Sequence, residues 1–217
     1  MPRGVVTLVF DDGYQNVYDH ILPLLARYGV RAVFAIPVKT EQIAHSEGVP
    51  VAPLAAWRGA CARGDHELAA HGVTHRAFTT LDDPTLRAEL ELCREVTGAT
   101  TVVYPGGAHD DRVMAEAKPL FGAGRTVRRG LETLPPADPL QLHSHVATRR
   151  NFRVWLWNLR ALWAWIANRW LIETYHAMSL SSEEHPDQHT VPLEAFERHL
   201  RFVRKLPVRL ATIRETM

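Results

Sequence analysis

The chain has 217 residues, of which 46% are hydrophobic and 23% charged, and its formal net charge is +1. This composition is typical of a folded globular domain and excludes an intrinsically disordered chain. The balance of 25 basic and 24 acidic side chains argues against nucleic acid as a partner. With only two cysteines, Cys61 and Cys93, a disulfide framework and a cysteine-based zinc knuckle are excluded.

Strands and helices alternate along the predicted chain. The apolar run from Val5 to Phe10 predicts a strand, and helical spacing of apolar residues follows it up to Gly29. A second helix is expected from Asp83 to Gly98, and a third begins after Pro192. Further strands are predicted at residues 31–36, 68–70, 101–104, 125–127, 171–175 and 208–212. About seven strands separated by helices indicate one α/β domain over residues 1–217, as a barrel or an open doubly wound sheet.

Polar residues stand where several of these strands end, at Asp11-Asp12, His71, Pro105-Gly106 and His176. In parallel α/β sheets, functional groups gather at the carboxyl ends of the strands. We therefore expect these side chains to meet at one edge of the sheet.

The pair Asp11-Asp12 can reach one centre only if the strand gives way to a turn, which Gly13 permits. The plain alternative is a helix-capping aspartate with a solvated neighbour. The run His71-Gly-Val-Thr-His75 can place two imidazoles on one ion, on a helix face or on a loop. Gly72 stands where zinc proteases carry glutamate, so that class is excluded. Two unrelated histidines are the alternative here.

Two histidines and one carboxylate form a three-ligand metal site that leaves room for water and substrate. The second aspartate could then take a proton from that water as general base. His176 is a candidate general acid. The backbone N–H groups after Pro105 could stabilise an oxyanion. This combination indicates metal-assisted hydrolysis of a carbonyl derivative.

Four motifs in this order resemble those of the polysaccharide deacetylases, the NodB-homology enzymes of carbohydrate esterase family 4. The motifs are Phe10–Gly13, Gly64–His75, Tyr104–Gly107 and Leu171–His176. The resemblance covers nearly the whole chain. It implies a distorted (β/α) barrel of about seven parallel strands and an enzyme that removes N-acetyl or related acyl groups from sugars.

The resemblance also implies roles for individual residues. Asp12, His71 and His75 would hold one divalent ion, zinc first, with cobalt or nickel as alternatives. Asp11 would be the general base and His176 the general acid.

The third motif would bind the substrate, with the backbone of Gly106 as the oxyanion hole. Substrate contacts are expected from Tyr104, Pro105, Gly107 and Trp157. Many family members carry an arginine two residues before the motif's proline, where it orients the base, but this chain has Val103. No Asp-Trp fourth motif is present either. His145 and Arg149 are the candidates for orienting the base.

The segment from Arg149 to Trp170 holds five of the six tryptophans together with five arginines. A helix here would bury one stripe, formed by Trp155, Leu159, Leu162, Ile166 and Trp170. Trp157, with Trp163 or Trp165, would then be exposed beside the active-site mouth. Such tryptophans could contact a sugar, a membrane interface or a second copy of the chain as a homodimer.

We expect a cytoplasmic, metal-dependent deacetylase acting on a sugar or glycoconjugate in glycan biosynthesis. This location rests on the lack of a secretory pattern or a membrane-spanning apolar run. A lipid-linked sugar at the inner membrane face, a nucleotide sugar or a small glycoside would suit it, with the protein peripheral at that face. One alternative is a small-molecule amidohydrolase, which a pocket closed by residues 149–170 would favour. The other is a membrane- or partner-binding protein on an inherited barrel.

Overall fold

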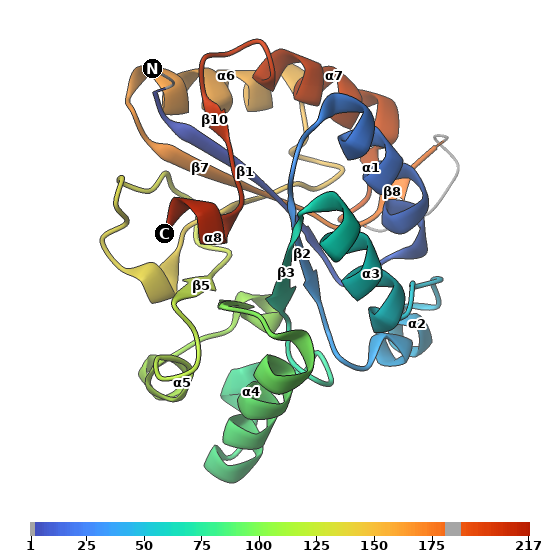
Figure 1. Cartoon of the computed structure of the whole chain (residues 1–217), viewed down its shortest axis with the longest axis vertical. Helices are drawn as coiled ribbons and strands as arrows, with labels where there is room; N and C mark the ends of the chain where they lie inside the picture. Colours follow the sequence, from blue (N-terminus) through green and yellow to red (C-terminus); the bar gives the residue numbers. More distant parts are fainter. Residues whose placement is uncertain (1–2, 181–187) are drawn as a thin grey trace.

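A computed structural model describes residues 3–180 and 188–217, in which eight parallel strands form one curved sheet (Figure 1). The strand order is β5-β4-β3-β2-β1-β7-β6, and the sheet curls into a half-barrel, which confirms the predicted distorted (β/α) barrel. The strands are β1 (Val5–Asp11), β2 (Val33–Ile36), β3 (Glu67–Ala70), β4 (Thr101–Val103), β5 (Ala123–Arg125), β6 (His145–Val146) and β7 (Trp170–Tyr175).

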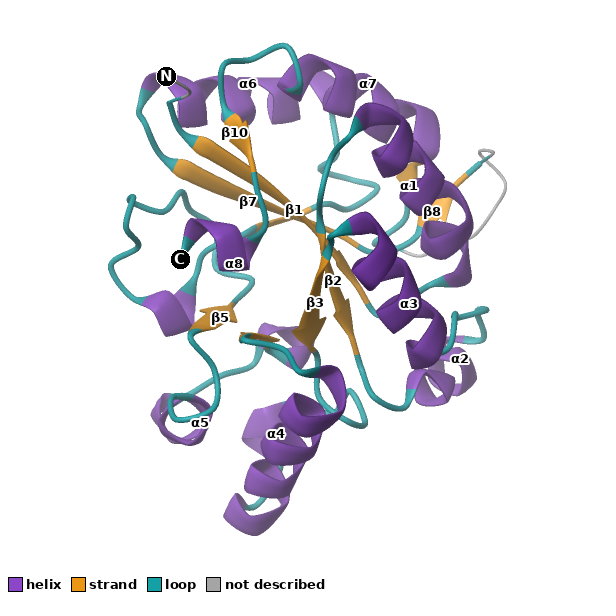
Figure 2. Cartoon of the chain, in the orientation of Figure 1, coloured by secondary structure: helices purple, strands orange, loops and turns teal. Residues whose placement is uncertain are grey.

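Helices cover the outer face of this sheet, with α6 and α7 side by side at one end of the view and α4 at the other (Figures 1 and 2). The helices are α1 (Gln15–Tyr28), α2 (Thr40–Glu47), α3 (Leu54–Gly64), α4 (Asp83–Thr97), α5 (Asp111–Ala117), α6 (Val154–Ile166), α7 (Leu193–Val203) and α8 (Ile213–Thr216). Short 3-10 turns form η1 (Phe78–Thr80), η2 (Pro105–Gly107) and η3 (Pro139–Gln141). Among the residues described, no helix combines the length and the apolar character needed to cross a membrane.

The predicted carboxyl ends of α1 and α4 are confirmed, and at each end a glycine adopts the left-handed backbone conformation. Gly29 ends α1 with φ +61°, and Gly98 ends α4 with φ +68°, a conformation that glycine adopts without steric cost. The cap at the start of α4 is Asp82 rather than Asp83. Its side chain accepts a hydrogen bond from the Thr85 N–H at 2.9 Å.

Two strands differ from their predicted bounds. The strand expected at 125–127 is β5, two residues earlier, because Gly124 lies inside the strand rather than in a turn. A Cβ at Gly124 would come within 2.5 Å of the Tyr104 hydroxyl, so close packing requires glycine there. The last strand, β10 (Arg209–Leu210), is shorter than predicted and pairs only with the start of β1.

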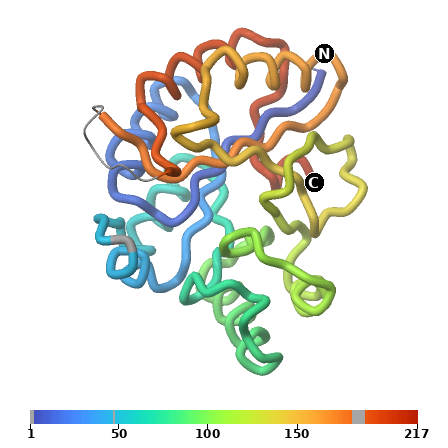
Figure 3. Tube along the Cα trace, turned by 180° about the vertical axis from the view of Figure 1, so that it is seen from behind, coloured from blue at the N-terminus to red at the C-terminus, as the bar shows by residue number. Residues whose placement is uncertain are grey.

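Alternation along β1 divides the core into two layers. Val6, Leu8 and Phe10 pack outward against the helices, whereas Val5 and Val9 pack inside the barrel. Seen from behind, β1 in blue runs beside β7 in orange, and six residue pairs join the two strands (Figure 3). Because alternate residues of β1 face the barrel interior, its last residue, Asp11, also faces inward, at the carboxyl end of the strand.

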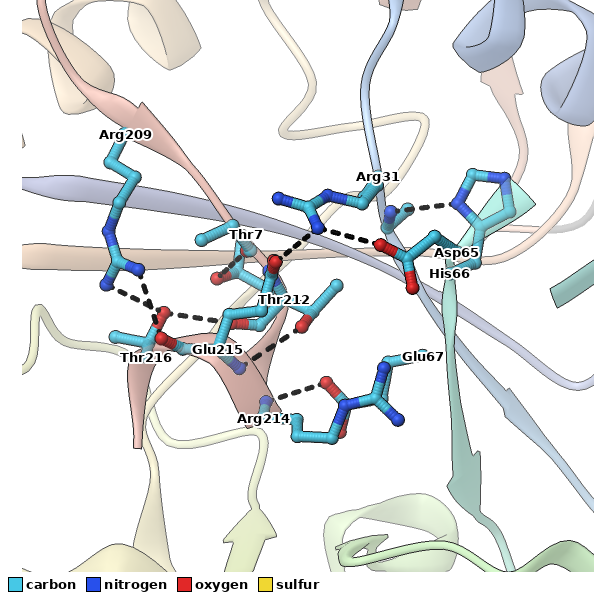
Figure 4. A network of polar contacts seen from close by, with 12 residues as sticks. Thr7, Arg31, Asp65, His66, Glu67, Arg209, Thr212, Arg214, Glu215 and Thr216 are labelled. Carbon is cyan, nitrogen blue, oxygen red and sulfur yellow. Dashed lines mark hydrogen bonds and ion pairs between the residues drawn. The ribbon is translucent and has the colours of Figure 1, made fainter. Parts of the chain in front are cut away.

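A separate polar network closes the barrel where the strands begin (Figure 4). The buried Glu67 carboxylate accepts hydrogen bonds from the Thr101 hydroxyl at 2.6 Å and the Arg214 N–H at 2.7 Å. Arg31 forms ion pairs with Asp65 at 2.9 Å and with Glu215 at 2.5 Å. Helix α8 is thereby held across this end of the barrel.

The face of α6 predicted to be buried is wrong. The face that is buried lies about half a helix turn away from it. Trp157, Ala161 and Ala164 are fully buried, whereas Trp155 is 65% exposed and Trp163 58% exposed. The small side chains of Ala161 and Ala164 let the helix approach the sheet closely, and Trp157 fills the space beyond them. Two further short strands, β8 (Met178–Ser179) and β9 (Val191–Pro192), pair with each other, and β8 follows β7 closely in sequence.

Candidate active site

Both predicted carboxylates stand at the carboxyl end of β1 and reach one cavity. Asp11 continues the inward phase of the strand, and Asp12 has φ +73°, a left-handed conformation that is uncommon for aspartate. Gly13 follows with φ +83°. This turn brings both side chains toward the same centre. The alternative role as a helix cap does not apply, because Tyr14 occupies the N-cap position of α1 without a side-chain cap.

The two predicted histidines lie on a loop after β3, not on a helix. Gly72 has φ +75° and His75 has φ +58°, so the chain coils tightly between them. Their imidazole rings approach with centroids 4.8 Å apart. Non-glycine residues held at positive φ cost free energy and cluster at functional sites. Asp12 and His75 are two such residues, and both belong to the candidate ligand set.

Glu89, on α4, holds this loop in place by hydrogen bonds. It was not identified from the sequence. Its carboxylate accepts a hydrogen bond from the Val73 N–H at 2.6 Å and another from the Thr74 hydroxyl at 2.7 Å. The Cys93 thiol, also on α4, donates to the Gly72 carbonyl at 3.4 Å. A glutamate on a predicted helix gives no local sign that it turns inward, so only the fold reveals this support.

The ligand atoms of Asp12, His71 and His75 lie within 4.8 Å of one another, close enough to share one ion. Asp12 Oδ1 is 3.1 Å from His75 Nε2 and 3.3 Å from His71 Nε2, yet it forms no hydrogen bond to any residue described. The Nδ1 atom of His71 is 2.8 Å from the Val103 carbonyl, which fixes it as the donor. The Nε2 lone pair then faces a carboxylate, and a divalent cation such as zinc fits between these acceptors.

Burial tends to raise the pKa of Asp12, but the imidazoles of His71 and His75 outweigh it. With a contribution from His176, they hold the pKa of this carboxyl well below its ordinary value. Asp12 is therefore ionised, as a metal ligand must be.

Arg125 is the residue that holds Asp11, which corrects the expectation of His145 or Arg149. Its Nη2 lies 2.5 Å from Asp11 Oδ2, and both side chains are almost fully buried. Arg125 ends β5 and is the direct register partner of Val103 on β4. The arginine expected at position 103 by resemblance is thus replaced by one at the same level on the next strand.

His176 follows β7 and faces both carboxylates. Its Nε2 is 3.7 Å from Asp11 Oδ2 and 3.8 Å from Asp12 Oδ2. Burial lowers the pKa of His176, the two aspartates oppose that shift, and His189 and Arg125 add to it. The ring of His189 lies 4.7 Å from that of His176, so a second imidazole borders the site.

These side chains line one cavity of about 720 Å³, together with Tyr104, Gly106 and Gly107 of the third motif. A Cβ at Gly106 would meet nothing within 4 Å, so open space adjoins its backbone. Pro105 is buried and does not line the cavity. The exposure predicted for Trp157 is wrong: it packs against Phe152 and Tyr175, with ring centroids 5.0 and 5.5 Å away. No residue from 149 to 170 lines this cavity.

Comparison with known structures finds the same fold at low sequence identity. The carbohydrate esterase family 4 domain of a multidomain xylanase, from the hindgut metagenome of Trinervitermes trinervoides, has 18% identity and a TM-score of 0.61, covering 99% of this chain and 89% of that one. The peptidoglycan N-acetylglucosamine deacetylase Bc1960 has 14% identity and a TM-score of 0.64, covering 99% and 88%. A family 4 pseudoenzyme from Bacillus anthracis has 13% identity and a TM-score of 0.59, covering 100% and 66%.

Among sequences, no curated protein matches the chain. A family model described as polysaccharide deacetylase matches residues 1–120. That range contains both aspartates at the end of β1, the histidine loop and the third motif. Because the match covers more than half of the 217 residues, the chain belongs to the polysaccharide deacetylase family.

Proposed function

We propose that this protein is a metal-dependent hydrolase that removes an N-acetyl, or another N-acyl, group from a sugar or glycoconjugate during glycan biosynthesis. One observation carries the proposal: a base, an acid and a complete ligand set face a single cavity. They are Asp11, His176, Asp12, His71 and His75. The proposed substrates include a sugar carried on a lipid.

A divalent ion held by Asp12, His71 and His75 would supply Lewis-acid chemistry at the cavity floor. Asp11 takes a proton from water as the water oxygen attacks the acyl carbon. Arg125 keeps the Asp11 carboxylate in place during this step, since a buried, charge-assisted contact restricts its rotation.

The second half of the reaction needs an acid on the amine side. As the carbon–nitrogen bond breaks, His176 gives a proton to the amine nitrogen, and the products are a carboxylic acid and a free amino sugar. The Gly106 backbone borders the position of the carbonyl oxygen and has room for it, because no side chain stands there.

A carbohydrate substrate is favoured over a small non-carbohydrate amide. The cavity volume falls within the usual range of small-molecule sites, roughly 300–1,000 Å³, so volume alone admits either substrate class. Residues 149–170 do not close it, which removes the feature that would have favoured a small-molecule amidohydrolase. One structural relative is described as a peptidoglycan N-acetylglucosamine deacetylase, and we extend a substrate of this chemical class to the present chain.

Catalysis is favoured over a binding role on an inherited barrel. The fold also occurs in a protein described as a pseudoenzyme, so the fold alone does not decide activity. In this chain the base, its arginine, the acid and three ligands all remain, which a binding role does not require.

Acetate release tests the proposal. Protein stripped with a chelator and reloaded with zinc, cobalt or nickel is incubated with N-acetylglucosamine oligomers, a nucleotide-linked and a lipid-linked N-acetyl sugar, and simple acyl amides, with Asp11→Asn as the inactive control. We expect metal-dependent release from at least one sugar. Cleavage confined to the simple amides would establish the amidohydrolase instead, and no release from any substrate by the loaded protein would exclude an enzyme of this class.

A further inference from the structure

Helix α6 carries an exposed apolar ridge that the proposed reaction does not use. The ridge consists of Trp155, Leu159, Trp163 and Ile166, whose spacing of four, four and three residues places them on one face. These are four of the eight large hydrophobic side chains exposed in the described residues. The other four are scattered, so in the part of the chain that the structure describes only α6 presents a continuous apolar surface.

A shallow hollow of about 340 Å³ lies beside this ridge, between α6 and the chain around Leu131. Its walls are apolar, and Leu156, Leu159 and Trp163 contribute to them. The Arg160 guanidinium lines the hollow and stacks over Trp157 at 4.9 Å. Its buried Nη1 has no hydrogen-bond partner among the residues described. The hollow therefore combines apolar walls with an unsatisfied cationic donor.

The surroundings of the ridge are cationic. The segment 149–170 contains five arginines and no aspartate, glutamate or lysine. Arg149, Arg150 and Arg153 are exposed before α6, and Arg169 is exposed after it. Within residues 3–180 and 188–217, none of these four forms an ion pair.

The charge pattern selects the occupant of this surface. A second copy of the chain would bring arginine clusters against each other, which repel, whereas an anionic surface would attract both ends of the helix. Tryptophan, like tyrosine, is enriched at the level of lipid headgroups. We propose that α6 docks the protein on an anionic lipid bilayer, with the tryptophan ridge in the headgroup region and the flanking arginines on lipid phosphates.

The geometry of α6 sets the orientation on the membrane. Its 13 residues span about 20 Å, too short to cross the bilayer core but suited to lying on its surface. Trp157, near its start, packs against Tyr175 at the end of β7, so the helix runs antiparallel to that strand. A bilayer along the ridge therefore lies parallel to β7, and the cavity opens sideways along the membrane surface rather than away from it.

Vesicle sedimentation tests the docking without any substrate. The full chain is mixed with vesicles of phosphatidylcholine alone or of phosphatidylcholine with phosphatidylglycerol. We expect binding to the anionic vesicles, weakened by salt, with a blue shift of tryptophan fluorescence. The double variant Trp155→Ser/Trp163→Ser should bind about tenfold more weakly or worse. Arg150→Gln and Arg153→Gln should each cost about fivefold.

Matched controls come from exposed residues on other helices. Leu92→Ser on α4 and Arg63→Gln on α3 remove an exposed apolar or cationic side chain and should bind as the wild type does. Equal binding to neutral and anionic vesicles, or full binding by the double tryptophan variant, would overturn the proposal. So would a dimer in analytical ultracentrifugation that the same double variant dissociates while the wild type ignores both vesicles.

Discussion

The two ends of the barrel differ in whether their buried polar groups have hydrogen-bond partners. At the amino end of the strands, Glu67 has both carboxylate oxygens satisfied, by a hydroxyl and a backbone N–H. At the carboxyl end, polar atoms are left over. Eight buried side-chain polar atoms lack a hydrogen-bond partner in the described residues, and six belong to residues lining the cavity. Those residues are Asp11, Asp12, Arg125, His176, His189 and Thr190.

This difference separates buried polar groups that stabilise the fold from buried polar groups that are placed to bind a ligand. An unsatisfied buried polar group costs roughly 1–3 kcal/mol, so a protein retains a cluster of them only where a ligand completes the set. The amino end gains stability from its network, whereas the unsatisfied groups at the carboxyl end cost stability, as expected where a ligand is to bind. Variants at the two ends should therefore separate activity from stability.

The largest effect is expected at the carboxyl end, from the two neighbouring aspartates. Asp11→Asn should lower turnover by about 100-fold or more, the contribution of a general base, and keep the metal. Asp12→Asn should lose the metal as well, because it removes a charged ligand. Metal analysis of both purified variants beside acetate release checks this. Loss of metal from Asp11→Asn alone would exchange the two roles.

A smaller effect is expected when the support of the base is loosened. Arg125→Lys keeps the positive charge but loses the planar guanidinium, so turnover should fall about 10- to 100-fold with little change in KM. Steady-state kinetics measure the split between kcat and KM. His145→Ala and Arg149→Ala serve as controls and should leave kcat near the wild-type value. A kcat loss in either control equal to that in Arg125→Lys would refute the assignment.

At the amino end, the expected effect moves from activity to stability. Glu67→Ala leaves the Thr101 hydroxyl and the Arg214 N–H without a partner, which should cost about 1–3 kcal/mol. For a chain of this size, each kcal/mol lowers Tm by roughly 2–4 °C. Thermal melts should show this loss, while kcat stays unchanged. Glu95→Ala, on the exposed face of α4, is the control and should change neither quantity.

The smallest effect is expected in the alkylation rates of the two buried thiols, one at each end of the barrel. Cys61 lies beside Glu67 at the amino end, and Cys93 lies under Gly72 at the carboxyl end. Burial raises the pKa of each thiol to about 12, so at pH 8 only about one in ten thousand is ionised. Both should resist iodoacetamide in the native protein. Added zinc should slow alkylation of Cys93 further but leave Cys61 unchanged, as peptide mass spectrometry can measure.

Much of the candidate site could be predicted because its parts are contiguous in sequence. Asp11 and Asp12 directly follow a strand, and His71 and His75 lie within five residues of each other. Arg125 could not be predicted in the same way. Its role depends on the register of β4 with β5, and that pairing is set by the fold rather than by a local pattern.

The face of α6 could not be predicted for a different reason. A helix that is apolar nearly all round has no single hydrophobic stripe, so periodicity does not choose its buried side. Side-chain size does not choose it either, because the bulky Trp157 is buried beside two alanines. Ala161 and Ala164 mark the face that approaches the sheet, and the bulkier Trp155 and Trp163 are left outside.

The pairing of β1 also has a consequence for folding during synthesis on the ribosome. The Thr7 hydroxyl bonds to the Ala211 carbonyl across 204 residues, and Trp170 bonds to the same hydroxyl across 163. At about 5–20 residues per second, roughly 10–40 seconds of translation separate Thr7 from Ala211. During that time this apolar strand is a target for chaperones. Protease digestion of ribosome-stalled chains should find β1 cleavable until residues 170–175 and 209–211 have emerged.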